Sequence, residues 1–380
     1  MFMRVFYLTD FLSPYRVEWM NLLSEKCEVT AYFFDEGEKT RENAWLKSIK
    51  NSFEKQQVKS VVLAGIRFSS EIFKILKNNR YDIYIVDGYS SFVQVRVIHW
   101  LTQNGKKVYV NVDGIDIWKK ETFVSKIKAV VKSGVYQSGA KFLCGSKIAA
   151  ARLISLGAKE ENVYTHPFTS LHTYDIISFE EKLRLQKTFK KKINAENKKV
   201  ALAVGRFIPL KEYDVLIKAW RLMPDDCILY LIGSGVLKND YLKLIDELSI
   251  KNIVILDHMD SERLNDYYLA ADLFVHTSNT EVWGLVFNEA MAKGCPIVST
   301  NQCVGAVELI RDGKEGYLIN VGDVETLHEK MLKILYDEPL RLSMMKQSTE
   351  RIIPYTYENL AKIHIGIFEK EQKKERLQKQ

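Results

Sequence analysis

Residues 272–300 constrain the fold most, because they contain every part of one strand–helix–strand unit. The apolar run Asp272–Ser278 predicts a buried strand, and a helical pattern from Leu285 to Lys293 follows a short acidic loop. Gly294 ends the predicted helix, and Ile297–Thr300 predicts a second strand. Strands joined in this way run parallel, and open parallel sheets bind ligands beyond the carboxyl ends of their strands.

Strand-like and helix-like segments also alternate along the rest of the chain. In the first half, Tyr81–Val86 and Val108–Val112 predict buried strands, whereas the polar residues 36–57 predict a loop with some helix. The alternation resumes after residues 178–199, a charged helical segment that marks the passage between two halves. We therefore expect an α/β protein with two parallel sheets, each covered by helices on both faces. A length of 380 residues suits two such domains.

The composition is that of a soluble globular protein, with 47% hydrophobic and 27% charged residues. No apolar run is long enough to span a bilayer, and the five cysteines lack metal-ligand spacing, as in a cytoplasmic protein with reduced thiols. Residues 1–193 hold 31 Lys and Arg against 20 Asp and Glu, and the rest hold 24 against 28. For any one lysine an ordinary solvated surface is the favoured interpretation, but a basic half joined to a mildly acidic half also suits an anionic surface or substrate.

The segment Ser90–Lys107 interleaves basic and aromatic residues. It could form a helix on a membrane surface, or a core-facing helix with a basic outer face. The second interpretation is favoured for this segment taken alone.

Two acidic residues, Glu281 and Glu289, flank the predicted helix start at Gly284. Gly284 allows a turn after which the backbone N–H groups of Leu285 and Val286 point out of the helix, where they suit an anion. Carboxylates beside a bound phosphate are unfavourable unless they accept hydrogen bonds from hydroxyl groups, and sugars supply such groups. The alternative is two surface glutamates beside a helix cap.

A second motif, GRFIPLK, follows a predicted strand and contains Gly205, Arg206 and Lys211. The glycine lets the loop approach a ligand, and the two cations can clamp a diphosphate. They could equally be surface charges on a loop. The motif Gly233-Ser234-Gly235 also follows a strand, although most such motifs are only turns.

Together these motifs resemble the family-four glycosyltransferases, which are retaining, nucleotide-sugar-dependent enzymes of GT-B fold. The resemblance covers the whole second half: GRFxxxK, the GSG loop, EVWGLVFNEAMAKG and GAVELIRDGKEG. It implies two Rossmann-like domains facing a cleft, with a last helix that crosses back to the first domain. The domains would comprise residues 1–172 with 357–380, and residues 173–356.

The resemblance also implies roles for residues of the second half. Arg206 and Lys211 would hold the donor diphosphate, Glu289 the ribose hydroxyls, and Glu281 the transferred sugar. The remaining donor-binding positions are backbone ones, namely Gly205, Gly233, Gly235, Gly284, Leu285 and Val286.

The first half departs more from the family pattern. Its first loop contains Asp10 and Arg16 but no glycine, although the S-P-Y-R sequence resembles one branch of the family. Asp113 stands where many relatives have a histidine, so it would either contact the transferred sugar or be an ordinary turn residue. His166 is the histidine expected near the site. The others are expected to be structural or exposed: His99, His172, His258, His276, His328 and His364.

We therefore expect a retaining glycosyltransferase of cell-surface polysaccharide biosynthesis, peripheral at the cytoplasmic face of the membrane. Its partners would be a nucleotide sugar, a saccharide or polyprenyl-diphosphate-linked acceptor and an anionic membrane surface, and not nucleic acid. No cofactor or metal is expected, because the sequence has no D-x-D motif and Arg206, Lys211 and the helix start can neutralise the diphosphate. The alternatives are a nucleotide-sugar epimerase, a phosphorylase or a non-catalytic protein that retains the fold.

Overall fold

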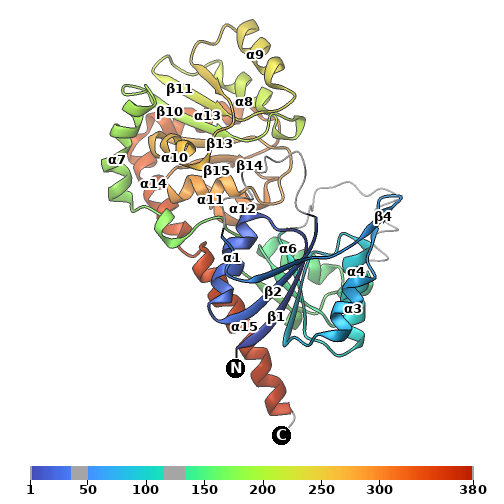
Figure 1. Ribbon diagram of the computed structural model, residues 1–380. Coiled ribbons are helices and arrows are strands. Elements are labelled where there is room, and N and C mark those ends of the chain that lie inside the picture. The colour runs from blue at the N-terminus through green and yellow to red at the C-terminus, as the bar shows by residue number, and fades with distance from the viewer. Residues whose placement is uncertain (1, 36–49, 115–132, 379–380) are drawn as a thin grey trace. The chain divides into compact units, whose positions relative to one another are not determined.

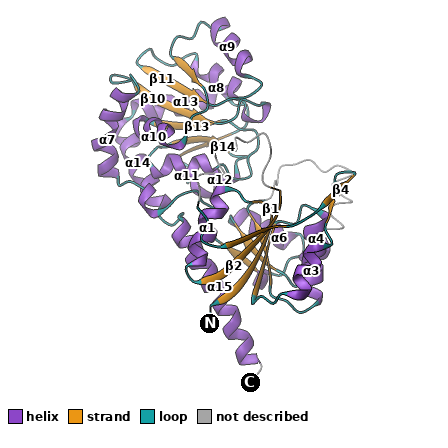
Figure 2. Cartoon of the chain, in the orientation of Figure 1, coloured by secondary structure: helices purple, strands orange, loops and turns teal. Residues whose placement is uncertain are grey.

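The computed structural model describes residues 2–35, 50–114 and 133–378. The chain divides into two compact units. The N-terminal unit contains Met1–Thr169 and Thr356–Gln380, and the C-terminal unit contains Ser170–Tyr355. Both units have a sheet of parallel strands with helices packed against it (Figure 2). Each unit is described separately below.

The N-terminal unit contains a seven-stranded sheet in the order β3-β2-β1-β6-β7-β8-β9, and every pair in it is parallel. The strand order reverses between β1 and β6, and such a switch point is where open α/β sheets bind ligands. The strands are β1 (Met3–Phe11), β2 (Cys27–Asp35), β3 (Glu54–Gln57), β6 (Ile83–Asp87), β7 (Val108–Val112), β8 (Lys141–Cys144) and β9 (Val163–Thr165).

Two hydrophobic clusters cover the two faces of this sheet. One cluster lies under α3, α4 and α6, and the other lies under α1 and α15. The last helix, α15, packs against α1, so the two ends of the chain meet in one unit (Figure 1). The helices are α1 (Pro14–Ser24), α3 (Glu71–Asn78), α4 (Phe92–Gln103), α6 (Lys147–Ser155) and α15 (Tyr357–Gln378).

The region after β2 differs from the sequence prediction. Within residues 36–57, the part from residue 50 onward contains strand β3 rather than helix, and residues 36–49 lie outside the described part. An antiparallel hairpin of β4 (Val61–Leu63) and β5 (Ile66–Phe68) follows, which the sequence analysis missed. Helix α4 buries its apolar side in the core, as the core-facing interpretation of Ser90–Lys107 predicts.

The C-terminal unit contains a six-stranded parallel sheet in the order β12-β11-β10-β13-β14-β15. Its order reverses between β10 and β13, which creates a second switch point. The strands are β10 (Lys199–Val204), β11 (Cys227–Ile232), β12 (Ile253–Leu256), β13 (Leu273–His276), β14 (Ile297–Thr300) and β15 (Gly316–Ile319).

A buried lysine ties two helices of this unit together. The fully buried Lys182 on α7 donates to the carbonyl oxygens of Tyr268, Leu269 and Ala271 at the end of α10, at 2.8–2.9 Å. A cation there satisfies carbonyl groups that have no partner within the helix. The helices are α7 (Phe179–Lys192), α8 (Tyr213–Trp220), α9 (Lys238–Glu247), α10 (Ser261–Ala270), α11 (Leu285–Ala292), α12 (Val304–Leu309), α13 (Val324–Tyr336) and α14 (Glu338–Ile352).

In the parts of the chain that the structure describes, no helix combines the length and the apolarity that a membrane span needs.

Candidate active site

An ion pair lies at the switch point of the C-terminal sheet. Lys211 ends the short helical turn Pro209–Lys211 in the loop after β10, and Glu281 lies in the loop after the neighbouring strand β13. The ammonium group of Lys211 contacts the Glu281 carboxylate directly. Two predicted site residues, 70 positions apart in the sequence, are therefore side by side.

Backbone hydrogen bonds hold both members of this pair in place. The hydroxyl group of Thr277 donates to the carbonyl oxygen of Lys211 at 2.8 Å. The backbone N–H group of Glu281 donates to the carbonyl oxygen of Gln302 at 3.2 Å, and that of Val304 donates to the carbonyl oxygen of Glu281 at 2.9 Å. Three loops at the sheet edge thus fix where the ion pair lies.

The surroundings of Glu281 keep it ionised. Burial favours its neutral form, but the nearby His276 and the Lys211 charge outweigh burial and lower the pKa of Glu281 to about 2. The Nε2 atom of His276 lies 3.8 Å from the carboxylate, and burial lowers the pKa of this histidine to about 4. The sequence analysis placed only His166 near the site, and this was wrong, because His276 is buried directly beside Glu281. At neutral pH the Glu281 carboxylate can therefore only accept hydrogen bonds.

Glu289 has a different environment on the second turn of α11. The hydroxyl group of Tyr268 donates to its Oε2 atom at 3.0 Å, and burial raises the pKa of Glu289. The nearby helix start requires glycine, because Gly284 adopts a left-handed φ of 87°. As the first helical residues, Leu285 and Val286 have backbone N–H groups without an acceptor inside the helix.

The loops after β10 and β11 stack so closely that glycine is required. A Cβ atom on Gly233 would lie 1.9 Å from the carbonyl oxygen of Gly205, and one on Gly235 would lie 2.4 Å from that of Phe207. A Cβ atom on Gly205 would meet the Tyr213 hydroxyl at 2.6 Å. Packing between the two loops thus explains Gly233 and Gly235, and packing against Tyr213 of α8 explains Gly205.

Arg206 lies on the same loop as Lys211, but the structure does not bring it into the ion pair. Its side chain is exposed, and within the described residues it makes no hydrogen bond or salt bridge. The predicted diphosphate clamp therefore has one cation held by Glu281 and one that extends into solvent.

A second polar cluster lies at the switch point of the N-terminal sheet. The buried Arg16, from the start of α1, contacts the carboxylates of both Asp87, at 2.6 Å, and Asp113. Tyr15 donates a hydrogen bond to Asp113 at 3.0 Å, and Thr9 donates one to Asp87 at 2.8 Å. Arg16 and Asp113 are predicted site residues that contact each other. Asp87 is a third member of the cluster, and the sequence prediction missed it.

One guanidinium group cannot neutralise two carboxylates, so this cluster carries excess negative charge. Burial, together with the charge of Asp113, raises the pKa of Asp87 to about 6 despite the opposing effect of Arg16. The sequence carried a signal for Asp87, because it precedes a glycine at the end of a predicted strand, as Asp113 does. Asp87 is nevertheless absent from the site residues that the motifs predict.

Of the other predicted residues of the first half, His166 lies beside the Arg16 cluster and Asp10 does not. His166 lines a cavity of about 20 Å³ together with Arg16 and Asp113, and its ring packs against His364 at 4.8 Å. Asp10 accepts a hydrogen bond from Gln94 at 3.2 Å and does not contact the Arg16 cluster. Among the described residues, no group of three or more His, Cys, Asp or Glu side chains could hold a metal ion.

Three of the predicted site residues lie within a match to a known protein family. Residues 186–351, which include Lys211, Glu281 and Glu289, match the family model described as "Glycosyl transferases group 1". This part of the chain belongs to the group 1 glycosyl transferases. The chain therefore carries a group 1 domain, as the resemblance of the motifs predicts.

Curated relatives are named as glycosyltransferases. The chain is 31% identical over 153 residues to N-acetylgalactosamine-N,N'-diacetylbacillosaminyl-diphospho-undecaprenol 4-alpha-N-acetylgalactosaminyltransferase of Campylobacter jejuni. It is 30% identical over 155 residues to the lipopolysaccharide core biosynthesis glycosyltransferase LpsE of Rhizobium meliloti. Each match covers 40% of this chain, and the chain spans 42% and 44% of the lengths of these two relatives.

Solved structures share the fold over almost the whole chain. The structure is similar to that of Anabaena HepE in complex with UDP and glucose, with a TM-score of 0.74 and 15% identity, over 97% of this chain and 100% of that one. At this identity the similarity concerns the fold alone. The predicted α/β fold of GT-B type is confirmed, because both units contain a parallel sheet and the solved structures that share the fold are GT-B glycosyltransferases.

Proposed function

We propose that this protein is a retaining glycosyltransferase that moves a sugar from a nucleotide diphosphate sugar to a lipid-linked saccharide in cell-surface polysaccharide assembly. The observation that carries the proposal is the Lys211–Glu281 pair, held at the switch point of the C-terminal sheet beside the helix start at Gly284. The names of the relatives support the acceptor class, since one acts on a diphospho-undecaprenol saccharide and another in lipopolysaccharide core biosynthesis.

In this proposal the donor lies along the loops of the C-terminal unit. Lys211 and Arg206 neutralise the diphosphate, together with the N–H groups that open α11. The ionised Glu281 accepts hydrogen bonds from hydroxyl groups of the transferred sugar. The Oε2 atom of Glu289 already accepts a hydrogen bond from Tyr268, so its other carboxylate oxygen accepts hydrogen bonds from the ribose hydroxyl groups.

Transfer exchanges one bond at the anomeric carbon for another on the same face. The bond from C1 to the phosphate oxygen breaks, and C1 bonds to the acceptor oxygen. The departing phosphate oxygen takes the proton of the acceptor hydroxyl, so no protein nucleophile is needed. The cations and helix start stabilise the negative charge that develops on the leaving diphosphate, which is the role a metal ion has in other enzymes.

We further propose that the basic N-terminal unit binds the acceptor, and that the enzyme works without a metal at the cytoplasmic membrane face. The cluster of Arg16, Asp87 and Asp113 offers hydrogen-bonding groups at the switch point of that unit. Asp113 is the more exposed of the two carboxylates and is therefore the one available to a sugar hydroxyl.

Thermal-shift screening with UDP-, GDP- and ADP-sugars would first identify the donor. Lys211→Ala should then lower turnover at least about 100-fold, because an electrostatic contact to the developing charge is lost. Lys218→Ala, which removes an exposed lysine paired with Asp214, is the matched control and should leave turnover unchanged. Turnover should also survive EDTA. Near-normal rates for Lys211→Ala, or metal-dependent rescue after EDTA, would contradict these assignments.

A further inference from the structure

The β4–β5 hairpin exposes an unusual amount of apolar surface. The exposed fractions of Val61, Val62, Leu63 and Ile66 are 59%, 54%, 62% and 45%. The two strands form a sheet of their own, separate from the main sheet of the unit. Contiguous exposed apolar residues of this kind mark interaction sites, and an isolated two-stranded hairpin is only marginally stable in water.

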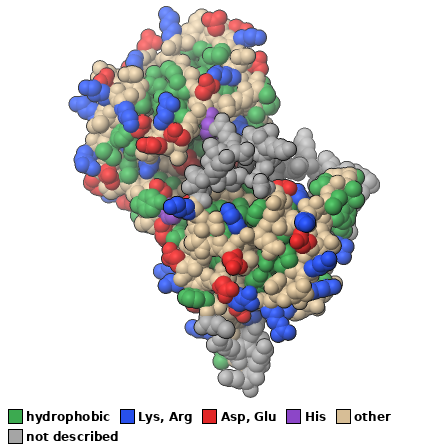
Figure 3. Space-filling view, in the orientation of Figure 1, with side chains coloured by type: hydrophobic (Ala, Val, Ile, Leu, Met, Phe, Trp, Pro, Cys, Tyr) green, Lys and Arg blue, Asp and Glu red, His purple; other side chains and the backbone are tan. Residues whose placement is uncertain are grey.

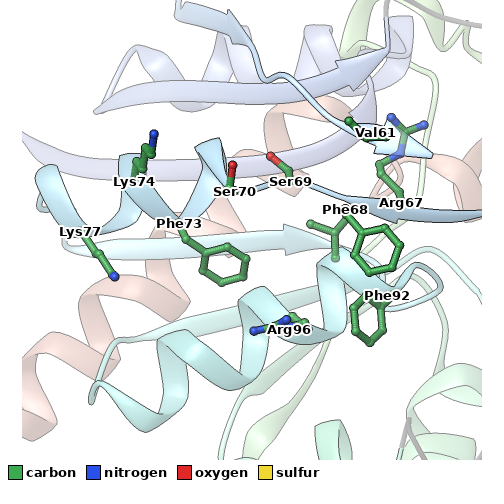
Figure 4. Close-up of a pocket in the computed structure, with 11 residues that line it drawn as sticks. Val61, Arg67, Phe68, Ser69, Ser70, Phe73, Lys74, Lys77, Phe92 and Arg96 are labelled. Atoms are coloured by element: carbon green, nitrogen blue, oxygen red, sulfur yellow. The ribbon is translucent and has the colours of Figure 1, made fainter. Parts of the chain in front are cut away.

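A groove of about 620 Å³ extends from this hairpin along α3 and α4. Figure 4 shows Phe68, Phe73 and Phe92 directed into the groove, with Arg96 among the rings. Lys74 and Lys77 from α3 lie at the end away from the hairpin in the same view. The groove therefore combines aromatic walls with cations, and none of its lining residues is acidic.

Three of the groove cations are available to a ligand. Arg67 is already paired with Asp35, whereas Lys74, Lys77 and Arg96 are exposed and form no salt bridge within the described residues. The Arg96 guanidinium lies over the ring of Phe73 at 5.6 Å and that of Phe92 at 5.8 Å, which leaves its edge free to bind phosphate.

We propose that this face docks on an anionic phospholipid bilayer. The hairpin tip enters the interfacial layer, and Lys74, Lys77 and Arg96 bind lipid phosphates. In Figure 3 hydrophobic side chains gather around the position of β4, with Lys and Arg side chains along the adjoining edge of the same unit. A protein partner would have to supply acidic and apolar groups in matching order, whereas a bilayer presents phosphates above acyl chains over its whole surface.

This face is the surface through which the proposed enzyme would meet the membrane. Its role in catalysis rests on the proposed function, in which the acceptor is lipid-linked. Each basic residue near an anionic surface strengthens binding about five-fold, so three of them contribute roughly 100-fold. The electrostatic contribution of these cations to vesicle affinity decreases with salt, because the Debye length shortens. The contribution from burial of the apolar hairpin tip does not.

Co-sedimentation with vesicles tests the proposal without donor or acceptor. The full-length protein should bind vesicles of phosphatidylcholine with about 30% phosphatidylglycerol at least 10-fold more tightly than phosphatidylcholine alone. Lys74→Gln/Lys77→Gln/Arg96→Gln and Val62→Thr/Leu63→Thr should each reduce that binding at least 10-fold. The matched controls alter exposed residues of the C-terminal unit and should bind like wild type: Arg221→Gln/Lys243→Gln/Lys251→Gln and Leu222→Thr.

A fluorescent label distinguishes loss of docking from loss of folding. All five native cysteines are buried, so Leu63→Cys can be labelled selectively with an environment-sensitive dye. Its emission should shift to the blue on anionic vesicles, and the same dye at Leu222→Cys should not respond. Vesicle binding that is unchanged in both groove variants, or a dye at position 63 that remains in water, would overturn the proposal. Donor binding measured on the same variants should be unchanged, so failure of docking and failure of the donor site give different results.

Discussion

Two glutamates of the C-terminal unit have pKa values that their surroundings shift in opposite directions. Lys211 and His276 lower the pKa of Glu281 to about 2, whereas burial raises the pKa of Glu289. Glu281 therefore keeps its charge over a wide pH range. Glu289 is the more readily protonated of the two, so in mild acid donor binding should weaken through Glu289 before it weakens through Glu281.

Replacing Glu289 tests its role at the nucleoside end of the donor. Glu289→Ala should weaken donor binding about 10- to 100-fold, because hydrogen bonds to a charged group contribute about 1.5–3 kcal/mol. Tyr268→Phe removes only the hydrogen bond that orients the carboxylate and should weaken binding less. Calorimetric titration measures both variants. Unchanged affinity in Glu289→Ala would remove this residue from the site.

Asp113 could contact the transferred sugar or serve only as a turn residue, and its partners allow these two roles to be separated. Asp87 is more buried than Asp113, so Asp87→Ala should leave Arg16 poorly compensated and destabilise the protein by about 3 kcal/mol. Asp113→Ala should destabilise less but lower turnover about 100-fold if Asp113 contacts the transferred sugar. Thermal unfolding and steady-state kinetics distinguish the two roles. A loss of stability without loss of turnover in Asp113→Ala would identify it as structural.

At the scale of elements, the loops after β10 and β11 stack so closely that position 233 has no room for a Cβ atom. Gly233→Ala would place a methyl group against the carbonyl oxygen of Gly205 and should cost about 2 kcal/mol or more of stability, with weaker donor binding. Gly366→Ala is the control, because nothing lies within 4 Å of its Cβ position in α15. That change should be neutral or stabilise by up to about 1 kcal/mol. Equal effects in chemical denaturation would refute the packing argument.

The strand–loop motifs were predictable because parallel sheets place ligand sites at strand ends. The contact between Lys211 and Glu281 could not be predicted in the same way. It depends on β10 lying next to β13, and the local sequence does not determine the order of strands in a sheet. The β4–β5 hairpin was missed because its two-residue loop, Ala64-Gly65, lacks the Asn or Asp that usually precedes glycine in such turns. Both loop residues have positive φ, which is uncommon for alanine and gave no signal in the sequence.

At the scale of the whole molecule, the chain leaves the N-terminal unit at Thr169 and returns to it with α15. The returning helix buries His364 completely, against Trp19, His166 and Phe368. Burial lowers the pKa values of both His364 and His166. The attachment of the last helix therefore depends on two imidazoles that stay neutral.

The stability of the N-terminal unit should consequently fall in mild acid. Unfolded histidines take up protons near pH 6.5, whereas the buried pair does so only at lower pH, so the stabilisation is complete above 6.5 and is lost as pH falls below it. Each differential proton gives a slope of up to about 1.4 kcal/mol per pH unit. His364→Phe should reduce this slope, and His258→Gln, which alters an exposed histidine, should not. Urea denaturation between pH 5.5 and 7.5, followed by hydrogen exchange of α1 and α15, measures it. A slope that His364→Phe leaves unchanged would show that this histidine does not control the attachment of α15.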